Sequence, residues 1–381
     1  MKTKMLPLTA AIALALGAAG SACAQEQIVK IGHVGPLTGP SAHLGKDIEN
    51  GARMAIEELN AKGVTLGGNK IKFVLLAEDD ASDPKQGTAA AQKLVDARIN
   101  GVIGHLNSGT TIPASRIYYD AGIPQISPAS TNQKYTQQGF NSVFRVVAND
   151  GQLGGALGRY AATTLKAKNI AVIDDRTAYG QGLSEEFTKG AEAAGVNIVA
   201  TQFTNDKATD FNAILTSIKA KNPDVIFFGG MDAVAGPMLR QMKQLGIKAR
   251  FMGGDGICTT ALGTLGGDGV INDRVVCAEA GGVEDSGKKG LDDFKAAFQK
   301  KYNTEVKLYA PYSYDSVMTM VEAMQKADSA DPKKYLPELA NINYKGITGM
   351  IAFDAKGDIK DGTLTLYTYK DGNRTLLTVT K

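Results

Sequence analysis

The chain has 381 residues, of which 43% are hydrophobic and 21% are charged, with 44 Gly, 12 Pro and three His. This is the composition of a globular protein long enough for two domains, and it excludes a disordered chain, a collagen-like chain and a small disulfide scaffold. The formal net charge of +3 is too small to indicate binding to nucleic acid or to an anionic membrane surface. With only three His and three Cys, a zinc site is not expected, and no cofactor is predicted.

The first element in chain order is a targeting segment over residues 1–24. Two early lysines precede an apolar stretch, and small residues then end in Ala22-Cys23-Ala24, which is the pattern of a secretory signal peptide and its cleavage site. The apolar stretch is shorter than the roughly 20 residues that a membrane span needs. The alternatives are an uncleaved anchor and a lipoprotein modified at Cys23, although Gly20 stands where a lipobox needs Leu. We therefore expect a soluble exported protein, most simply a bacterial periplasmic one.

Cleavage would remove Cys23 and leave Cys258 and Cys277 as the two cysteines of the mature chain. In an oxidising compartment such a pair is a disulfide candidate, and the short segment between them would make the bond a local staple. The alternative is two buried free thiols.

The chain beyond the targeting segment alternates β-branched runs with helical segments. The pattern predicts strands over 28–34, 71–77, 101–105 and 123–127, and helices over 47–60, 84–97 and 112–121. This alternation is typical of a parallel sheet with helices on both faces.

The alternation then restarts, which predicts a second unit of the same kind. Its predicted elements are helices over 152–165, 182–194, 211–220 and 235–245, and strands over 169–175, 196–203, 224–230, 249–254 and 273–280. The glycines of GQLGGALGRY (151–160) are interpreted as close helix packing. After Gly281 we expect helices over 291–301, 315–326 and 332–340, a glycine-rich strand region over 346–359 and a last strand over 364–372. Two α/β lobes with a ligand in the crevice between them fit this order.

Motifs for catalysis are missing from the sequence. The first strand is followed by Gly35-Pro36-Leu37-Thr38-Gly39, which does not fit the glycine fingerprint of a dinucleotide site, and no phosphate loop occurs. His33, His43 and His105 have no metal-ligand spacing. His105 lies three residues before Ser108, but strand geometry does not predict that the two side chains pair. The sequence therefore predicts a protein that is not an enzyme and holds no metal.

Two loops with small hydroxylated residues follow predicted strands of the first unit, over 105–115 and 126–135. Free backbone N–H groups at a helix start, together with Ser and Thr hydroxyls, can bind an anion without a charged side chain. The alternative is ordinary helix capping, in which Ser and Thr are preferred. The residues suited to a ligand carboxylate are Ser108, Thr110, Ala129, Ser130 and Thr131.

The second unit offers a carboxylate instead. Asp255 lies in FMGGDGI (251–257), in a glycine-rich turn after a predicted strand, where it can pair with a ligand ammonium group. The alternative is an ordinary turn residue, since Asp between glycines is common in turns. An anion holder in one lobe and a cation holder in the other predict a site for a zwitterion, which would favour the closed state by contacting both lobes.

Five segments carry a resemblance to a known family: IVKIGHVGPLTGPSAHLGKD, AEDDASDPKQGTAAAQKLV, VIGHLNSGTTIPAS, GIPQISPASTN and FMGGDG. They resemble the leucine/isoleucine/valine-binding proteins, which are periplasmic receptors of branched-chain amino acid ABC importers. The resemblance implies a type I periplasmic-binding-protein fold, with two doubly wound parallel-sheet lobes joined by three crossovers. Lobe 1 would comprise 25–147 and 281–364, and lobe 2 would comprise 148–280 and 365–381. It also implies a monomer whose partners are a small amino acid and the membrane permease subunits of an importer, with no nucleic acid.

The resemblance also implies roles for individual residues. Ser108 and Thr131 look like partners of the ligand carboxylate, and Ala129 looks like the position whose backbone holds both ends of the ligand. Tyr179 looks like the lobe-2 aromatic residue that closes on the ligand. Asp255 stands where these receptors usually have Glu.

Departures from the family pattern lie near the expected ligand chamber. The family's disulfide in lobe 1 would join the positions that Ser82 and Asn107 hold here. Three further positions bear on the ligand: Leu44 replaces an aromatic residue, Met231 replaces a ligand-contacting Tyr, and Tyr309 lies near a pocket-lining aromatic position. We expect a small aliphatic, branched-chain amino acid, with proline and γ-aminobutyrate as alternatives. Receptors for amides, urea or aromatic acids are a further alternative.

Overall fold

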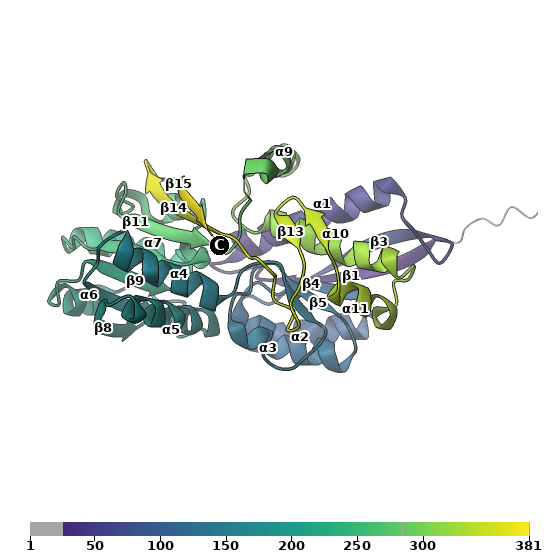
Figure 1. The fold of residues 1–381 in the computed structure, drawn as a ribbon, viewed down its shortest axis with the longest axis horizontal. Coiled ribbons are helices and arrows are strands. Elements are labelled where there is room, and N and C mark those ends of the chain that lie inside the picture. Colours follow the sequence, from purple (N-terminus) through teal and green to yellow (C-terminus); the bar gives the residue numbers. More distant parts are fainter. Residues whose placement is uncertain (1–25, 284, 381) are drawn as a thin grey trace, which may run out of the picture.

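The computed structural model describes residues 26–283 and 285–380, so the predicted targeting segment over 1–24 lies outside the described residues. The described chain forms two α/β lobes, each built on its own large sheet (Figure 1). We call lobe 1 the part around the six-stranded sheet, with strand order β2-β3-β1-β4-β5-β6, and lobe 2 the part around the seven-stranded sheet, with order β15-β14-β11-β10-β9-β7-β8. The expected two-lobed α/β architecture is thus confirmed.

Lobe 1 has the predicted parallel sheet, in which β1 pairs in parallel with β3 and β4 and the ladder continues through β5 to β6. Its first elements are β1 (Gln27–Gly35), α1 (Ala42–Lys62), β2 (Thr65–Leu66), β3 (Asn69–Asp79), α2 (Pro84–Asp96), β4 (Gly101–Gly104), α3 (Ser108–Asp120), β5 (Gln125–Ser127) and β6 (Val143–Arg145). Later in the chain it gains α9 (Asp285–Tyr302), α10 (Ala310–Lys326), α11 (Pro332–Ala340) and the small hairpin β12 (Tyr344–Gly346) and β13 (Gly349–Ile351). The strand region expected over 346–359 is therefore only this short hairpin and one further bridge, Phe353 to Ile359.

Lobe 2 repeats the alternation and ends with two antiparallel strands. Its elements are α4 (Asp150–Thr163), β7 (Asn169–Asp174), α5 (Ala178–Ala193), β8 (Asn197–Phe203), α6 (Asn212–Lys219), β9 (Val225–Gly229), α7 (Asp232–Gln244), β10 (Arg250–Gly253), α8 (Leu262–Gly266), β11 (Val275–Glu279), β14 (Leu364–Lys370) and β15 (Asn373–Thr380). Strand β14 pairs with β11, so the end of the chain returns to this lobe. The single last strand predicted over 364–372 is in fact the first half of a β14–β15 hairpin.

Helices α4 and α5 pack against each other at very short range. A Cβ atom on Gly158 would lie 2.5 Å from the backbone nitrogen of Ala191, and one on Gly154 would lie 2.7 Å from that of Phe187. Since Cβ atoms never approach so closely, only glycine fits at these positions. The interpretation of 151–160 as a close-packing segment is confirmed.

Three segments carry the chain between the lobes, and hydrogen bonds join them to one another. The backbone N–H of Ala148 donates to the carbonyl of Ala280 at 2.8 Å, and the Thr365 hydroxyl donates to the carbonyl of Gly281 at 2.7 Å. The three segments thus form one compact connection. Beside it, the carboxyl ends of the parallel strands of one sheet face those of the other sheet (Figure 1).

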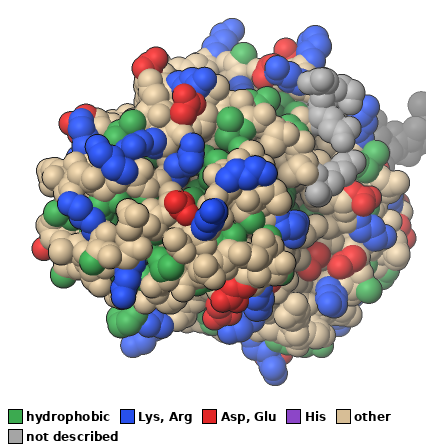
Figure 2. Space-filling view, turned by 60° about the vertical axis from the view of Figure 1, so that its left-hand side comes forward, with side chains coloured by type: hydrophobic (Ala, Val, Ile, Leu, Met, Phe, Trp, Pro, Cys, Tyr) green, Lys and Arg blue, Asp and Glu red, His purple; other side chains and the backbone are tan. Residues whose placement is uncertain are grey.

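The outer surface carries mixed charge. On the face drawn in Figure 2, Lys and Arg side chains are spread over the surface, and hydrophobic side chains do not gather in one large patch. This face therefore gives no sign of an apolar surface for a protein partner. Within residues 26–283 and 285–380, no helix is long and apolar enough to cross a bilayer.

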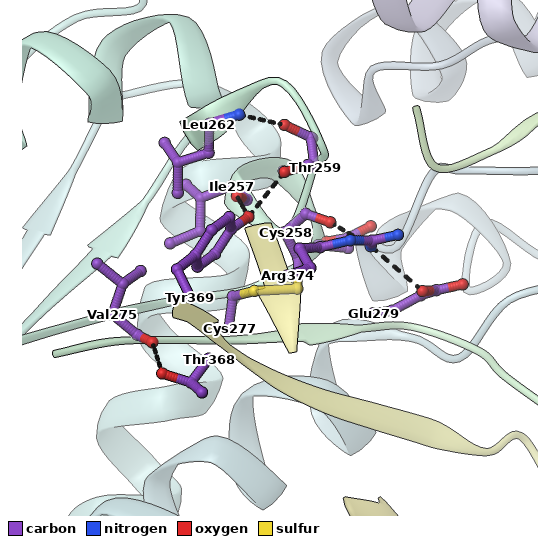
Figure 3. The surroundings of a disulfide bond; sticks show 12 residues. Ile257, Cys258, Thr259, Leu262, Val275, Cys277, Glu279, Thr368, Tyr369 and Arg374 are labelled. Atoms are coloured by element: carbon purple, nitrogen blue, oxygen red, sulfur yellow. Dashed lines mark hydrogen bonds and ion pairs between the residues drawn. A yellow bond between two sulfur atoms is a disulfide. The ribbon is translucent and has the colours of Figure 1, made fainter. Parts of the chain in front are cut away.

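A disulfide joins Cys258 and Cys277, and both side chains are fully buried (Figure 3). It fastens the turn after β10 to strand β11. The β14–β15 hairpin forms two hydrogen bonds to the same turn. The Tyr369 hydroxyl donates to the carbonyl of Thr259 at 2.7 Å, and the Arg374 guanidinium donates to the carbonyl of Cys258 at 2.6 Å. The turn that carries Asp255 is therefore fixed both covalently and by hydrogen bonds.

Loss of this disulfide should destabilise lobe 2. For a closed loop of roughly 15–20 residues, the restricted unfolded chain accounts for about 3 kcal/mol. We expect the Cys258→Ala/Cys277→Ala variant to lose about this much free energy of unfolding, measured by urea denaturation and circular dichroism. Reducing agent should lower the midpoint of the wild-type protein and leave that of the variant unchanged. Equal midpoints for the two oxidised proteins would contradict the prediction.

Candidate functional site

The expected site residues come from loops at the facing carboxyl ends of the two sheets. Ser108 follows β4, and Ala129, Ser130 and Thr131 follow β5, all in lobe 1. Asp255 follows β10 in lobe 2. Parallel strands bring these loops to the same edge of each sheet, so the fold itself places them on the crevice.

The lobe-1 side of the site is the start of α3. Its N-cap residue, Asn107, makes no side-chain capping bond, so the first turn has no cap from that amide. Ser108 is 1% exposed, and its hydroxyl accepts hydrogen bonds from the Ser130 hydroxyl at 3.2 Å and from the Asn132 N–H at 3.3 Å. The Thr110 hydroxyl donates back to the Asn107 carbonyl instead, as in ordinary helix starts. The capping interpretation therefore holds for Thr110, whereas Ser108 faces the loop over 129–132.

The lobe-2 side of the site is Asp255, which is 1% exposed. Its carboxylate accepts hydrogen bonds from the Tyr179 hydroxyl at 2.8 Å and from the Tyr309 hydroxyl at 2.9 Å. Burial raises the pKa of Asp255 to about 6, although the two tyrosine hydroxyls act to lower it. Among the described residues no basic side chain pairs with this carboxylate, so it is buried and neutralised by no cation of the chain. A ligand cation is the partner that such a group lacks.

The two lobes are closed on each other through polar contacts around this centre. Tyr309 belongs to lobe 1, so its bond to Asp255 crosses between the lobes. The Asn132 amide donates to the carbonyl of Ala178 at 2.6 Å, which is a second crossing contact. The third joins the His43 imidazole to the Asp232 carboxylate at 2.8 Å. Burial lowers the pKa of His43, but Asp232 outweighs this effect and raises it overall.

The remaining expected residues divide into two groups. Asn107, Tyr179 and Met231 line a cavity of about 450 Å³ that opens between the lobes. Leu44 is fully buried and belongs to the same apolar cluster as Ala129 and Tyr309. The structure brings the cavity-lining group to the crevice. Leu44 does not line this cavity, but its apolar cluster also contains Tyr179 and Met231.

Ser82 and Asn107, at the positions where the resemblance implied a lobe-1 disulfide, are joined by a hydrogen bond of 3.0 Å between their side chains. This bond connects the loop after β3 to the start of α3.

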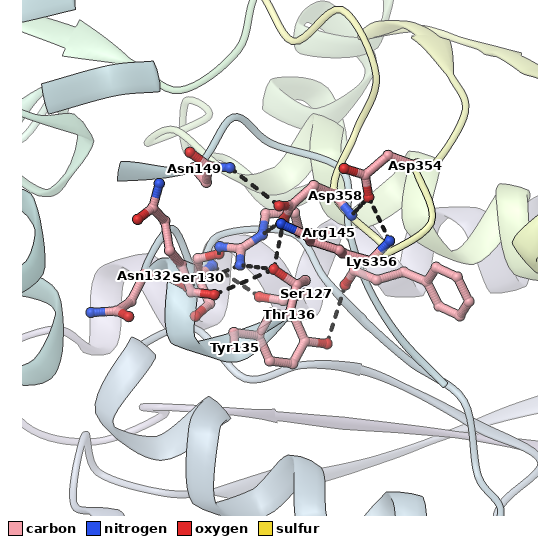
Figure 4. A network of polar contacts seen from close by, with 12 residues as sticks. Ser127, Ser130, Asn132, Tyr135, Thr136, Arg145, Asn149, Asp354, Lys356 and Asp358 are labelled. Atoms are coloured by element: carbon pink, nitrogen blue, oxygen red, sulfur yellow. Dashed lines mark hydrogen bonds and ion pairs between the residues drawn. The ribbon is translucent and has the colours of Figure 1, made fainter. Parts of the chain in front are cut away.

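Sequence reasoning missed Arg145, at the end of β6. It is fully buried, and its guanidinium donates to the carbonyls of Ser130 at 2.7 Å and Asn132 at 2.9 Å and to the Asp358 carboxylate at 2.6 Å (Figure 4). It also stacks over the ring of Tyr135, 5.2 Å from the ring centre. Arg145 therefore holds the backbone of the loop that carries the expected ligand contacts. The sequence signal for it is a lone Arg in an apolar strand.

The structure also answers the catalytic alternatives. His105 contacts the Asp80 carboxylate and the Tyr118 hydroxyl, both at 3.1 Å, and does not pair with Ser108. Within the described chain, no group of three His, Cys, Asp or Glu side chains could hold a metal ion.

Comparison with known sequences finds a family and close relatives. The family described as periplasmic binding protein matches residues 28–374. The chain is 37% identical over 363 residues to a Leu/Ile/Val-binding protein homolog from Brucella abortus, covering 95% of both chains. It is 35% identical over 369 residues to the leucine-, isoleucine-, valine-, threonine- and alanine-binding protein of Pseudomonas aeruginosa, covering 97% of this chain and 96% of that one.

Comparison with solved structures gives the same kind of protein. A leucine-binding protein from Thermotoga maritima superimposes with a TM-score of 0.83 at 28% identity, covering 92% of this chain and 98% of that chain. A branched-chain amino acid transporter substrate-binding protein from Streptococcus pneumoniae, solved with isoleucine, superimposes with a TM-score of 0.82 at 25% identity, covering 93% and 99%. The fold class is thus the expected type I periplasmic-binding-protein fold.

Proposed function

We infer the function of this chain from its family: it belongs to the periplasmic binding proteins, and among these to the leucine/isoleucine/valine-binding proteins. We propose that it captures a branched-chain amino acid between its lobes and delivers it to the permease of an ABC importer. The observation that carries the proposal is Asp255, a buried carboxylate with two tyrosine donors and no basic partner among the described residues. The names of the relatives support the choice of ligand.

The proposed ligand pose follows from the positions of the α3 N-terminus and Asp255. The ligand carboxylate would lie at the first turn of α3 against the Ser108 hydroxyl and the backbone near Ala129 and Thr131, where N–H groups and the helix dipole favour negative charge. The ligand ammonium would lie against Asp255. The aliphatic side chain would point into the cavity lined by Asn107 and Met231.

Ligand binding would then drive closure of the lobes. A ligand shifts an equilibrium toward the state in which it makes more contacts, and this pose has partners in both lobes only when they are closed. The proposed moving bodies are 25–147 with 281–364 and 148–280 with 365–381, hinged at the three joined crossing segments. We propose that the mature protein acts as a monomer in the periplasm, after removal of residues 1–24.

A thermal-shift panel tests the proposed ligand class. The protein is first unfolded, washed and refolded to remove any bound ligand, and then mixed with each amino acid, γ-aminobutyrate, urea and benzoate. A ligand at 100 times its dissociation constant adds about 2.7 kcal/mol to the stability of the folded state. We expect leucine, isoleucine or valine to raise the melting temperature most. Stabilisation by urea or benzoate alone would overturn the proposal, and proline or γ-aminobutyrate is included because Asp255 is one methylene shorter than Glu.

Ligand affinity should also fall in acid. Burial raises the pKa of Asp255 to about 6 despite the hydrogen bonds from Tyr179 and Tyr309, and only the ionised carboxylate attracts an ammonium group. Below this pKa the group must lose a proton before it can bind, so affinity should drop by about tenfold for each pH unit. Isothermal titration with leucine between pH 4.5 and 8 checks this, with circular dichroism confirming that the protein stays folded. Equal affinities at pH 4.5 and pH 7 would contradict it.

A further inference from the structure

The first residue of α4, Asp150, is buried without a partner. It is 1% exposed, and neither of its carboxylate oxygens has a hydrogen-bond partner. Among the buried carboxyl groups within residues 26–283 and 285–380, only that of Asp150 has both oxygens unpaired. A buried polar group without partners is costly, so its presence calls for an explanation.

Two other buried aspartates show how the chain treats a purely structural carboxylate. Asp47 accepts four backbone N–H bonds of 2.8 to 3.0 Å from residues 307–310. Asp315 accepts the N–H groups of Ile347 and Thr348 together with the Thr348 hydroxyl. Asp150 has no such cradle, which sets it apart from these structural groups.

Helix capping does not account for Asp150. The capping of α4 is performed by Asn149, whose side chain accepts from the N–H of Gln152 while the Gln152 side chain bonds back to the Asn149 N–H. A negative charge in the first turn of a helix is favourable by at most about 1 kcal/mol at an ordinary surface site. That gain does not require burial of both oxygens.

The position of Asp150 is on the boundary between the lobes, beside the proposed ligand site. Its backbone N–H donates to the carbonyl of Thr131 at 2.8 Å, and one carboxylate oxygen lies 3.0 Å from where a Cβ atom on Gly182 of α5 would be. The Thr131 hydroxyl, in the proposed ligand-binding loop, is fully buried and makes no hydrogen bond of normal geometry, although it lies close enough to Asp150 to lower the pKa of that carboxyl group. A second orphaned group thus adjoins the first at the same place.

The charges around Asp150 leave it in need of a cation. Burial raises its pKa to about 8, the Thr131 hydroxyl and Arg145 act to lower it, and Asp255 and Glu186 act to raise it. The Arg145 guanidinium already donates hydrogen bonds to the Asp358 carboxylate and to the carbonyls of Ser130 and Asn132. An ammonium group between Asp150 and Asp255 would supply the donors that the unpaired oxygens lack and would favour the ionised carboxylate.

We propose that Asp150 is a second carboxylate of the ligand site, which binds the ligand ammonium group together with Asp255 and Thr131. The inference rests on the proposed function, since it takes the ligand to be an amino acid. The inference adds a residue at the lobe boundary to the part of the site that binds the ammonium group. The ligand ammonium would then bridge the lobe-1 loop that carries Thr131 and the first turn of α4.

The test compares Asp150→Asn with Asp315→Asn by two measurements. Leucine affinity is measured by isothermal titration on refolded protein, and stability without ligand is measured as the urea midpoint. For Asp150→Asn we expect leucine affinity to fall by roughly tenfold to a hundredfold, because a charge-assisted hydrogen bond is lost, while the midpoint stays the same or rises. For Asp315→Asn we expect the opposite, a lower midpoint with unchanged affinity.

Each other outcome is decisive. Leucine affinity of Asp150→Asn within twofold of wild type would overturn the inference, and so would a loss of midpoint as large as that of Asp315→Asn, since it would show a structural role. If Asp150→Asn does not fold, Asp150→Glu is measured instead. Wild-type leucine affinity at the wild-type midpoint in Asp150→Glu would support a requirement for the negative charge. Loss of both leucine affinity and midpoint in this variant would overturn the inference. A wild-type protein that binds no amino acid would overturn the proposed function and this inference with it.

Discussion

Replacing Asp255 by alanine should abolish amino acid binding while the protein remains folded. The ligand ammonium would be buried in the closed crevice without its main counter-charge, and removing one partner of a buried ion pair costs about 3–5 kcal/mol. We therefore expect leucine affinity to fall by about two to four orders of magnitude. Isothermal titration measures the loss, and circular dichroism shows whether the fold is intact.

The fold should tolerate this change because Asp255 contributes little to stability. Its raised pKa, about 6, shows that burial opposes the ionised form in the protein without ligand. The matched control is Tyr309→Phe, which removes one hydrogen bond to the carboxylate and keeps the charge. Its affinity should fall by no more than about tenfold, in line with one hydrogen bond. If Asp255→Ala binds leucine as tightly as Tyr309→Phe does, the role assigned to Asp255 is wrong.

Replacing Arg145 by methionine should destabilise the protein strongly and weaken binding. The guanidinium is fully buried and holds the Asp358 carboxylate and two loop carbonyls, which the apolar side chain would leave unpaired (Figure 4). We expect a loss of about 3–5 kcal/mol in the free energy of unfolding. Affinity for leucine should also fall, because Ser130 and Asn132 lie in the loop that we propose binds the ligand.

The matched control is Arg116→Met in α3. Arg116 forms an ion pair with Asp120 at 2.8 Å, but both side chains are exposed, and such pairs contribute about 1 kcal/mol or less. Urea denaturation followed by circular dichroism compares the two variants. Arg145→Lys should lie between them, because lysine restores the charge but cannot reach several acceptors at once. Similar midpoints for Arg145→Met and Arg116→Met would show that the buried network is not what fixes the loop.

The sequence predicted most strands and helices in their order, because buried parallel strands and amphipathic helices leave clear patterns. It missed strands β2 and β6 and helix α8, which are too short to leave such a pattern. It misplaced helix starts where hydroxyl-rich residues resemble loops. Helix α3 begins at Ser108 and not at the predicted position 112, since its first hydroxyls bond back to the turn before it. The β14–β15 hairpin was missed although Asp371-Gly372 is a turn signal between two alternating segments.

For the site, the sequence indicated the loops and the structure added the residues whose roles depend on distant partners. Asp255 could be chosen from a glycine-rich turn after a strand. Its two tyrosine donors come from other elements, 76 and 54 residues away along the chain. Arg145 and Asp150 could not be found from spacing at all, because the first is defined by contacts with Asp358 and the second by a lack of contacts.

The central claim is that the crevice binds a zwitterion by a separate holder for each charge. The most direct measurement is isothermal titration of refolded protein with leucine and with 4-methylpentanoate, which has the same carbon skeleton and carboxylate but no ammonium group. We expect leucine to bind and 4-methylpentanoate to bind at least about a hundredfold more weakly, since Asp255 would then be buried without a cation. Equal affinities for the two compounds would contradict the account.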